Sequence, residues 1–183
     1  MQRVWVVVLA FLVLCGSAFA QVPKGNVFFG YSYEHTPVVS NDSINTNGWN
    51  ASLEGKVFPF LGLVVDVDGH YGSGTFLAGC TPPVCSFTSA DVAEHNVLLG
   101  PRVSFQVGKV RPFAEVMIGA AHISRSNGIS DSDTSFANAV GGGLDYRVAG
   151  PISLRAQFDW IETRFYSNTQ NGVRFSTGIA FHF

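Results

Sequence analysis

Alternation of apolar and polar residues with a period of two is the feature that most constrains what this chain can fold into. In residues 152–161, Leu154 and Phe158 fall on one face, and Arg155 and Asp159 fall on the other. This pattern is typical of a β-strand with two different faces. It recurs at about 26–35, 47–58, 61–71, 93–105, 110–123, 136–147 and 172–183. The chain is therefore predicted to be all-β, with eight antiparallel strands.

The connections between these strands alternate between long and short. Residues 36–46, 72–92, 124–135 and 162–171 form long, polar segments, whereas 59–60, 106–109 and 148–151 are tight turns. Strands of about 9 to 11 residues suit a tilted crossing of a bilayer. Long loops on one side and short turns on the other fit an outer-membrane barrel with both termini in the periplasm. We expect an up-and-down transmembrane β-barrel.

The first 20 residues have the pattern of an export signal. Arg3 precedes an apolar stretch that ends at Leu14, and Ala18 and Ala20 supply a small-x-small cleavage site. We expect residues 1–20 to be a cleaved signal peptide, with Cys15 inside it, and residues 21–183 to form the barrel domain. Export predicts that the chain reaches the outer membrane and meets its lipid.

Charge argues against a nucleic-acid partner. The chain has 11 basic and 13 acidic residues, and the loss of Arg3 makes the mature domain slightly more acidic. A basic footprint of the kind that binds nucleic acid is therefore not expected. After the leader, no apolar run approaches the ~20 residues of a membrane helix. A membrane-spanning chain of this kind must be a closed barrel, because lipid leaves no partner for free backbone groups.

Two cysteines follow the leader, Cys80 and Cys85, in the sequence CTPPVC. Because exported chains meet an oxidising compartment, we expect a disulfide between them. A metal site is the alternative, but no further Cys or His lies nearby at ligand spacing. His70 and His95 are expected to face one another across the second long loop. No metal or cofactor is expected.

Charged residues are predicted to line the interior. Alternation places these acids and bases on the inner face: Glu34, Glu54, Asp66, Asp68, Glu94, Glu115, Asp145, Asp159, Lys56, Arg102, Arg111, Arg147, Arg155 and Arg174. Because isolated buried charges are costly, we expect them to pair in a network that fills the lumen. Eight strands enclose little more than their own side chains. A narrow, gated ion pathway is the alternative.

His122 and Ser124 form the one arrangement that suggests catalysis, since residues two apart share a strand face. The pair resembles the His-x-Ser of outer-membrane lipid A deacylases. Arg125 follows where that family has Asn, the motif lies early in the chain, and His122 is expected to face lipid. An acid that would orient the histidine is not clearly placed. We therefore expect the chain not to be an enzyme.

The last eight residues resemble the assembly signal of bacterial outer-membrane barrels, with Ser176, Gly178, Phe181 and Phe183 at the defined positions. The resemblance implies recognition by the barrel assembly machinery through Phe181 and Phe183. Residues 24–183 as a whole resemble the small OmpA/OmpX type of barrel. By that likeness Asp145 and Arg155 pair inside the barrel. A peptidoglycan-binding domain after the barrel is not expected, so cell-wall anchoring is not carried over from that family.

The expected role is structural or surface-interacting. A monomeric barrel of this type would bind an extracellular ligand through its four long loops. Two alternatives stay open: a narrow porin-like channel for ions or solutes, and a lipid A-modifying barrel enzyme.

Overall fold

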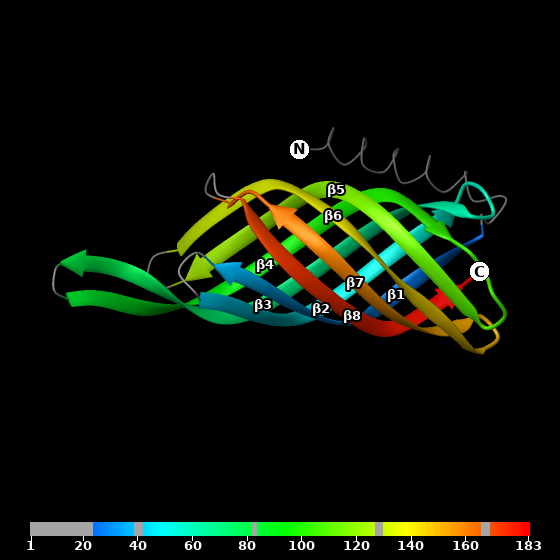
Figure 1. Ribbon diagram of the computed structural model, residues 1–183, viewed down its shortest axis with the longest axis horizontal. Helices are drawn as coiled ribbons and strands as arrows, with labels where there is room; N and C mark the ends of the chain where they lie inside the picture. Colours follow the sequence, from blue (N-terminus) through cyan, green and yellow to red (C-terminus); the bar gives the residue numbers. More distant parts are fainter. Residues whose placement is uncertain (1–23, 39–41, 82–83, 127–129, 166–168) are drawn as a thin grey trace, which may run out of the picture.

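The computed structural model describes residues 24–38, 42–81, 84–126, 130–165 and 169–183. These residues form eight strands (Figure 1): β1 Gly25–Val38, β2 Asp42–Lys56, β3 Leu61–Thr81, β4 Val84–Ser104, β5 Val110–Ser126, β6 Ser130–Ala149, β7 Ile152–Thr163 and β8 Gln170–His182. The described part of the chain contains no helix that is long and apolar enough to cross a membrane.

Each strand pairs antiparallel with its neighbours in the sequence, and β1 also pairs with β8. The closing register sets Ser32 opposite Ser176 and Gly30 opposite Gly178. The eight strands thus form one closed barrel, and the predicted fold class is confirmed. Closure matters in lipid, because every strand of the wall then has a hydrogen-bonding partner on both sides.

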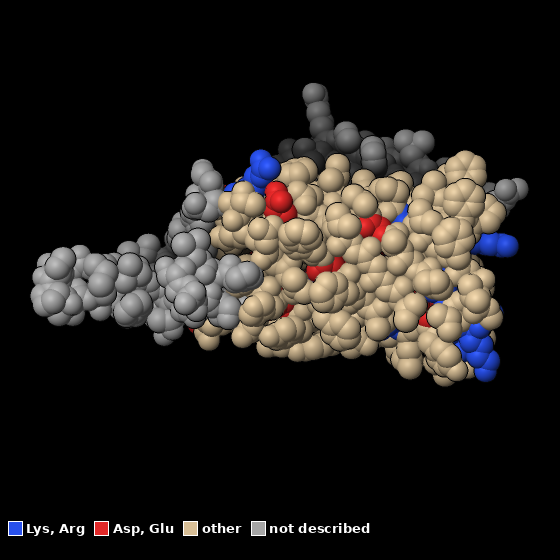
Figure 2. Space-filling view, in the orientation of Figure 1, with Lys and Arg blue, Asp and Glu red and all other residues tan. Residues whose placement is uncertain are grey.

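The two faces of the wall differ as the alternation predicted. On β7 the outward Leu154 and Phe158 are 54% and 55% exposed, whereas the inward Arg155 is 1% exposed. The outer surface of the barrel is a wide belt of uncharged atoms, with few charged side chains in view (Figure 2). An apolar outer belt over a polar interior is the arrangement of a barrel that is solvated by lipid.

The interior of the barrel is polar only in part. On β4, β5 and β7 the buried Leu98, Met117 and Ile161 belong to one apolar cluster inside the barrel. Phe28 and Phe113 are also buried there. The buried alanines Ala121, Ala137 and Ala139 also belong to this cluster. The interior is therefore packed partly by apolar side chains and partly by the charged residues described below.

The strands run further than predicted into the four long connections. The pairing of β1 with β2 continues to Val38 and Asp42, and that of β5 with β6 to Ser126 and Ser130. The long connections were expected to be loops, and that prediction is wrong for most of 36–46, 72–92 and 124–135, whereas in the described part of 162–171 only the ends of β7 and β8 are strand. Polar residues on both faces do not prevent antiparallel pairing, since the backbone hydrogen bonds do not depend on burial.

The hairpin of β3 and β4 extends beyond the rest of the wall. Pairing of β2 with β3 ends at Tyr71, and pairing of β4 with β5 ends at Asp91. Between those two positions, β3 and β4 pair only with each other, as far as Thr81 and Val84. This two-stranded ribbon projects from one end of the barrel (Figure 1), which we call the hairpin end.

The opposite end carries the three short turns and the C-terminus, and we call it the turn end (Figure 1). The β2–β3 turn is closed by a hydrogen bond from Leu61 N to Phe58 O of 3.2 Å. Gly108 and Gly150 adopt φ values of 61° and 50°, which favour glycine in the other two turns. A register shift just after Arg147 lies next to the last turn. Arg147, expected inside, is exposed there.

Candidate functional site

Inside the barrel, Arg174 on β8 lies among three carboxylates. Its Nη2 is 2.8 Å from Asp159 Oδ2 on β7, and its Nη1 is 2.9 Å from Asp66 Oδ1 on β3. Asp68, also on β3, forms a third ion pair with the same guanidinium. All four side chains are fully buried. The five donors of one guanidinium allow a single arginine to serve several acceptors in this way.

Asp68 extends this group toward β1. Its Oδ1 is 3.0 Å from His70 Nδ1 and accepts a hydrogen bond of 2.9 Å from the Asn96 amide. His70 Nε2 is 2.9 Å from Ser32 Oγ, and its Nδ1 is 3.4 Å from a Glu34 oxygen. His70 is therefore part of the interior network. The prediction that it faces His95 is wrong, because His95 pairs with Gly69 and lies exposed on the outer surface.

Arg155 on β7 makes the second centre of the network, close to the turn end. Its Nε and Nη2 donate to the two oxygens of Asp145 on β6, at 2.6 and 2.8 Å. Nη2 also donates to Asn26 on β1 at 2.9 Å. The guanidinium carbon lies 5.1 Å from the ring centroid of Phe28 and 4.8 Å from that of Phe113. Three hydrogen bonds and two ring contacts leave this side chain little freedom.

Arg102 on β4 is the third centre. Its Nε donates to Glu115 on β5 at 2.6 Å, and its Nη1 lies 3.4 Å from Glu54 on β2. The same guanidinium covers the Phe113 ring at 4.4 Å. Glu54 in turn forms an ion pair of 2.7 Å with Lys56, which donates to Ser104 at 2.6 Å. Lys56 lies nearest the turn end, and its side chain is 10% exposed.

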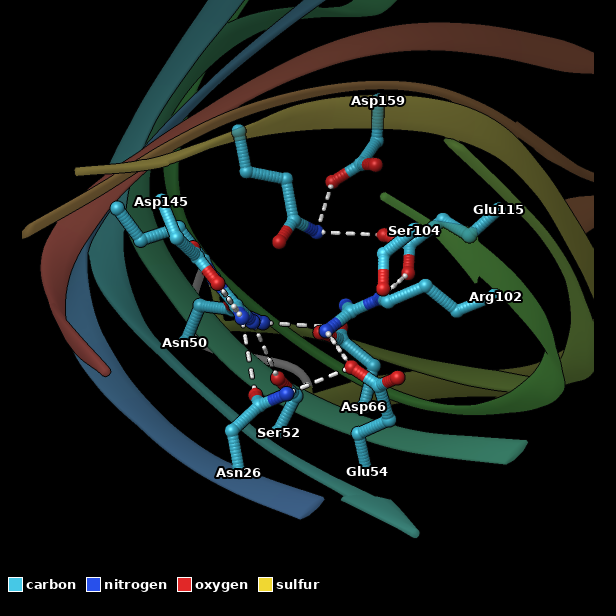
Figure 3. A network of polar contacts seen from close by, with 12 residues as sticks. Asn26, Asn50, Ser52, Glu54, Asp66, Arg102, Ser104, Glu115, Asp145 and Asp159 are labelled. Atoms are coloured by element: carbon cyan, nitrogen blue, oxygen red, sulfur yellow. Dashed lines mark hydrogen bonds and ion pairs between the residues drawn. The ribbon is translucent and has the colours of Figure 1, made fainter. Parts of the chain in front are cut away.

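Three amide side chains join the centres into one network, part of which is shown in Figure 3. Asn26 lies between Arg155 and Glu54, which accepts its hydrogen bond at 2.6 Å. Gln157 donates to Glu115 and to Asp159, both at 2.9 Å. Asn50 donates to Asp66, also at 2.9 Å. The residues of Figure 3 come from many strands and point toward the same central space, so the network ties the wall together across the lumen.

Glycines in the wall make room for these charges. A Cβ at Gly141 would lie 2.0 Å from Asp159 Oδ1, and a Cβ at Gly62 would lie 2.4 Å from Glu54 Oε1. A Cβ at Gly143 would lie 2.8 Å from the Phe113 ring. Large inward side chains on one strand are thus accommodated by glycine on the next, which is how a narrow barrel can hold three buried arginines.

The structure places all eight residues predicted for the charge network on the inner face. They are Glu54, Lys56, Asp66, Arg102, Glu115, Asp145, Arg155 and Asp159, and the contacts above involve every one of them. Arg174 and Asp68 were on the predicted inner face as well. The contribution of His70 was missed, although its spacing of two from Asp68 indicated the same face.

The three arginines of the network are buried inside the barrel. Arg102, Arg155 and Arg174 are 0%, 1% and 0% exposed, although each is among the largest side chains of the interior. Apolar side chains fill the adjoining space, as described above. Among the described residues, no group of three His, Cys, Asp or Glu side chains is arranged to hold a metal ion. The described interior thus consists of the charged network and the apolar cluster beside it.

His122 and Ser124 lie on the outer face of β5, and both are exposed. His122 Nδ1 is 2.8 Å from Thr134 Oγ1 on β6. The histidine thus interacts with a neighbouring threonine, and this contact does not activate the Ser124 hydroxyl.

The residues of the predicted assembly signal lie on β8 and at its end. Ser176 is buried and 3.0 Å from Ser32 Oγ, so it joins the first and last strands inside the wall. Gly178 allows close approach, because a Cβ there would lie 2.3 Å from Phe29 O. Phe181 and Phe183 are 48% and 43% exposed on the outer surface.

Cys80 and Cys85 are register partners near the tip of the β3–β4 hairpin. The predicted cleavage residues Ala18 and Ala20, and the whole predicted signal peptide, lie outside the described residues.

Comparisons with known proteins agree with this geometry. The sequence matches no curated protein. Neisserial surface protein A has a similar structure, with a TM-score of 0.67 at 15% identity over 87% of this chain and 97% of that one. Ail, the attachment invasion locus protein of Yersinia pestis, is similar with a TM-score of 0.57 at 15% identity over 87% and 99%. At such identities the likeness concerns the fold.

A match to a family of known proteins covers residues 6–183, nearly the whole chain. That family is described as the outer membrane protein beta-barrel domain. Together with the closed barrel of eight antiparallel strands, the match shows that this chain belongs to the outer membrane protein beta-barrel domain family.

Proposed function

We propose that this barrel is a surface-interaction protein whose working part is the β3–β4 hairpin, exposed outside the cell. The projection of this hairpin beyond all of its neighbours carries the proposal. Its two outer edges have no strand partner beyond Tyr71 and Asp91 within the described chain. Free edges offer backbone groups to a protein partner that adds a strand, which is a recurring mode of recognition.

The orientation rests on the asymmetry of the two ends. Small outer-membrane barrels have short turns in the periplasm and long connections outside. The turn end carries three tight turns and the C-terminus, whereas at the hairpin end β3 and β4 continue beyond the rest of the wall to Thr81 and Val84. On this basis the hairpin end faces the outside, after export with removal of residues 1–20 and insertion by the barrel assembly machinery.

Charge indicates the kind of ligand. The side chains at the hairpin end include the acids Asp91, Glu94 and Glu162, whereas Arg164 is itself paired with Glu162 at 3.6 Å. Ail has been crystallised with the heparin analogue sucrose octasulfate, a polyanion. The acidic rim of the present chain favours a protein partner over a polyanion, because like charges repel.

A cell-adhesion experiment tests the proposal. Cells that display the barrel are compared with cells that display a variant in which an Asn-Gly turn replaces residues 75–89. Adhesion is measured on surfaces coated with extracellular matrix protein, with heparin or with albumin. We expect adhesion to matrix protein above the albumin level and its loss in the variant at equal surface display. Equal adhesion of both forms to every surface would contradict the proposal.

In this proposal the interior charge network stabilises the barrel, and His122 and Ser124 have no catalytic role. Single-channel recording tests the first part, and we expect no regular conductance steps because three buried arginines fill the lumen. Regular steps would favour the narrow channel. A lipid A mass shift in cells that express the barrel, absent from His122→Ala cells, would favour the enzyme.

A further inference from the structure

The turn end gathers basic side chains that have no acidic partner. Lys24, Lys109 and Arg147 are exposed, and Arg111 is half-buried. Within the described chain, none of these four forms an ion pair with a side-chain carboxylate. Blue side chains are visible at this end of the barrel in Figure 2. Since the hairpin end is acidic, charge is separated along the barrel axis.

The acids nearest the turn end are already engaged inside the barrel. Glu54 and Asp145 are 1% and 2% exposed. Glu54 contacts Lys56 and Arg102, and Asp145 contacts Arg155. The basic side chains at the rim are therefore not neutralised by these carboxylates.

Part of this basic set lines a cavity of about 330 Å³ at the mouth of the barrel. Lys24, Lys56, Arg111 and His182 supply its polar wall. Lys56 and His182 also contact the interior acids Glu54 and Asp145, at 2.7 and 3.3 Å. Arg111 contacts the neutral Gln106 and the His182 ring, at 3.0 and 2.9 Å, so within the described chain its guanidinium is not paired with an acid.

One negative group, the C-terminal carboxylate of Phe183, stands at the edge of the cavity. The Phe183 oxygen accepts a hydrogen bond of 3.0 Å from the Gly25 backbone. The two cations Lys24 and Arg111, which have no carboxylate side chain as an ion-pair partner among the described residues, outweigh this single charge. The cavity is therefore suited to an anion.

Aromatic side chains beside the cavity place it at the level of lipid headgroups. Phe58 lines the cavity and stacks on Phe60 at 6.3 Å, which stacks on Phe105 at 6.5 Å. The three rings are 55%, 50% and 57% exposed on the outer surface. Rows of aromatic residues mark the interface between the hydrocarbon and the headgroups of a membrane around a barrel.

We propose that this cavity binds the phosphate group of an anionic phospholipid from the leaflet that surrounds the turn end. Lys24 and Arg111 would hold the phosphate oxygens, and the acyl chains would lie on the outward faces of Phe58 and Phe183. An apolar surface directly beside the cationic cavity favours a phospholipid over a soluble anion, because only the lipid uses both. The site does not depend on which ligand the hairpin end binds.

Native mass spectrometry of the barrel purified from outer membranes tests this site. The barrel is mixed in detergent with phosphatidylglycerol or with phosphatidylcholine of the same acyl chains. We expect tighter binding of phosphatidylglycerol, and a loss of about fivefold for each of Lys24→Gln and Arg111→Gln. Lys109→Gln is the matched control, because it removes the same charge from an exposed position at the same end but outside the cavity.

The heat-dependent shift in gel mobility of folded barrels verifies that each variant is folded. Lys24 is exposed, so its substitution tests the site even if Arg111→Gln does not fold. Equal affinity for the two lipids, or an equal loss in Lys109→Gln, would overturn the proposal. Inorganic phosphate is the third ligand, and binding as tight as that of the lipid, weakened equally by Lys24→Gln, would make this a soluble-phosphate site and overturn the lipid assignment.

Discussion

Arg174 joins three aspartates, two from β3 and one from β7, at a point where no water-exposed surface screens them. Arg155 joins β7 to Asp145 on β6, and Arg102 joins β4 to Glu115 on β5. Removal of a buried guanidinium leaves its carboxylate partners as uncompensated buried charges. The resulting loss of folding stability is larger than the net stabilisation that the ion pair contributes. The three arginines are therefore the residues on which the interior depends most.

Arg174→Ala is expected to lower the free energy of unfolding by about 3 to 5 kcal/mol, because it leaves three aspartates without their counter-charge. Urea unfolding of the barrel in lipid vesicles, followed by tryptophan fluorescence, measures the change. Arg164→Ala is the matched control, since Arg164 also pairs with an acid but has a side chain that is 65% exposed. A loss of about 1 kcal/mol or less is expected there. Equal losses in both variants would contradict the role given to Arg174.

Gly141→Ala is expected to lower the free energy of unfolding by about 1 to 3 kcal/mol, as overpacking does. The new methyl group would lie 2.0 Å from Asp159 Oδ1 and would push that carboxylate away from Arg174. Gly55→Ala is the control, because nothing lies within 4 Å of a Cβ at that position. The same urea titration compares the two variants. A Gly141→Ala barrel as stable as the Gly55→Ala barrel would refute this packing account.

The sequence predicted which charges face inward, because alternate residues of a strand share a face. It could not predict most of the partners. Asp145 and Arg155 are neighbours in the register of β6 and β7. In contrast, Arg174 reaches Asp68 across 106 positions of the chain, through a lumen whose width and register only the closed barrel sets. His70 lay in the predicted strand 61–71, but it was expected to face His95, so its contacts with Asp68 and Ser32 inside the barrel were not predicted.

At the scale of the elements, the ends of the strands were the least predictable feature. Apolar alternation marks only the part of a strand that contacts lipid, so it ends near Tyr71 on β3. The strand itself continues to Thr81. Pairing beyond the apolar belt is directed by the partner strand, and the Ser, Thr and Gly residues of these extensions carry no periodic signal. The short turns were predictable, because they lie at the ends of apolar segments and contain glycine or proline.

The β3–β4 hairpin is expected to carry a disulfide between Cys80 and Cys85. The two residues are opposite each other in the register, and directly paired residues of antiparallel strands bring their Cβ atoms to about 4.5 to 5.5 Å. Thiol titration of the unfolded barrel from outer membranes is expected to find no free thiol before reduction and two after it. Cys85→Ser is the control and is expected to show one free thiol throughout. Two free thiols in the untreated protein would contradict the disulfide.

At the scale of the whole molecule, the barrel is a polar plug inside a lipid-facing belt, with different charge at its two ends. The belt and the closed wall hold the barrel in the membrane, and the interior network resists collapse or opening of the lumen. The two ends of the barrel could bind ligands without a conformational change in the wall or in the interior network. On the two proposals above, function is divided by position: the acidic hairpin end would meet a partner outside, and the basic turn end would meet anionic lipid.

This division requires one orientation in the membrane, which single-cysteine labelling can test. In a variant without Cys80 and Cys85, Ser73→Cys marks the base of the hairpin and Lys109→Cys marks a turn, and both positions are exposed. A maleimide that cannot cross membranes should label Ser73→Cys in intact cells, and Lys109→Cys only after the outer membrane is permeabilised. Labelling in the reverse order would place the hairpin in the periplasm and overturn the surface role. The phosphate site would remain, but in the outer leaflet, because its cavity belongs to the turn end whichever way the barrel faces.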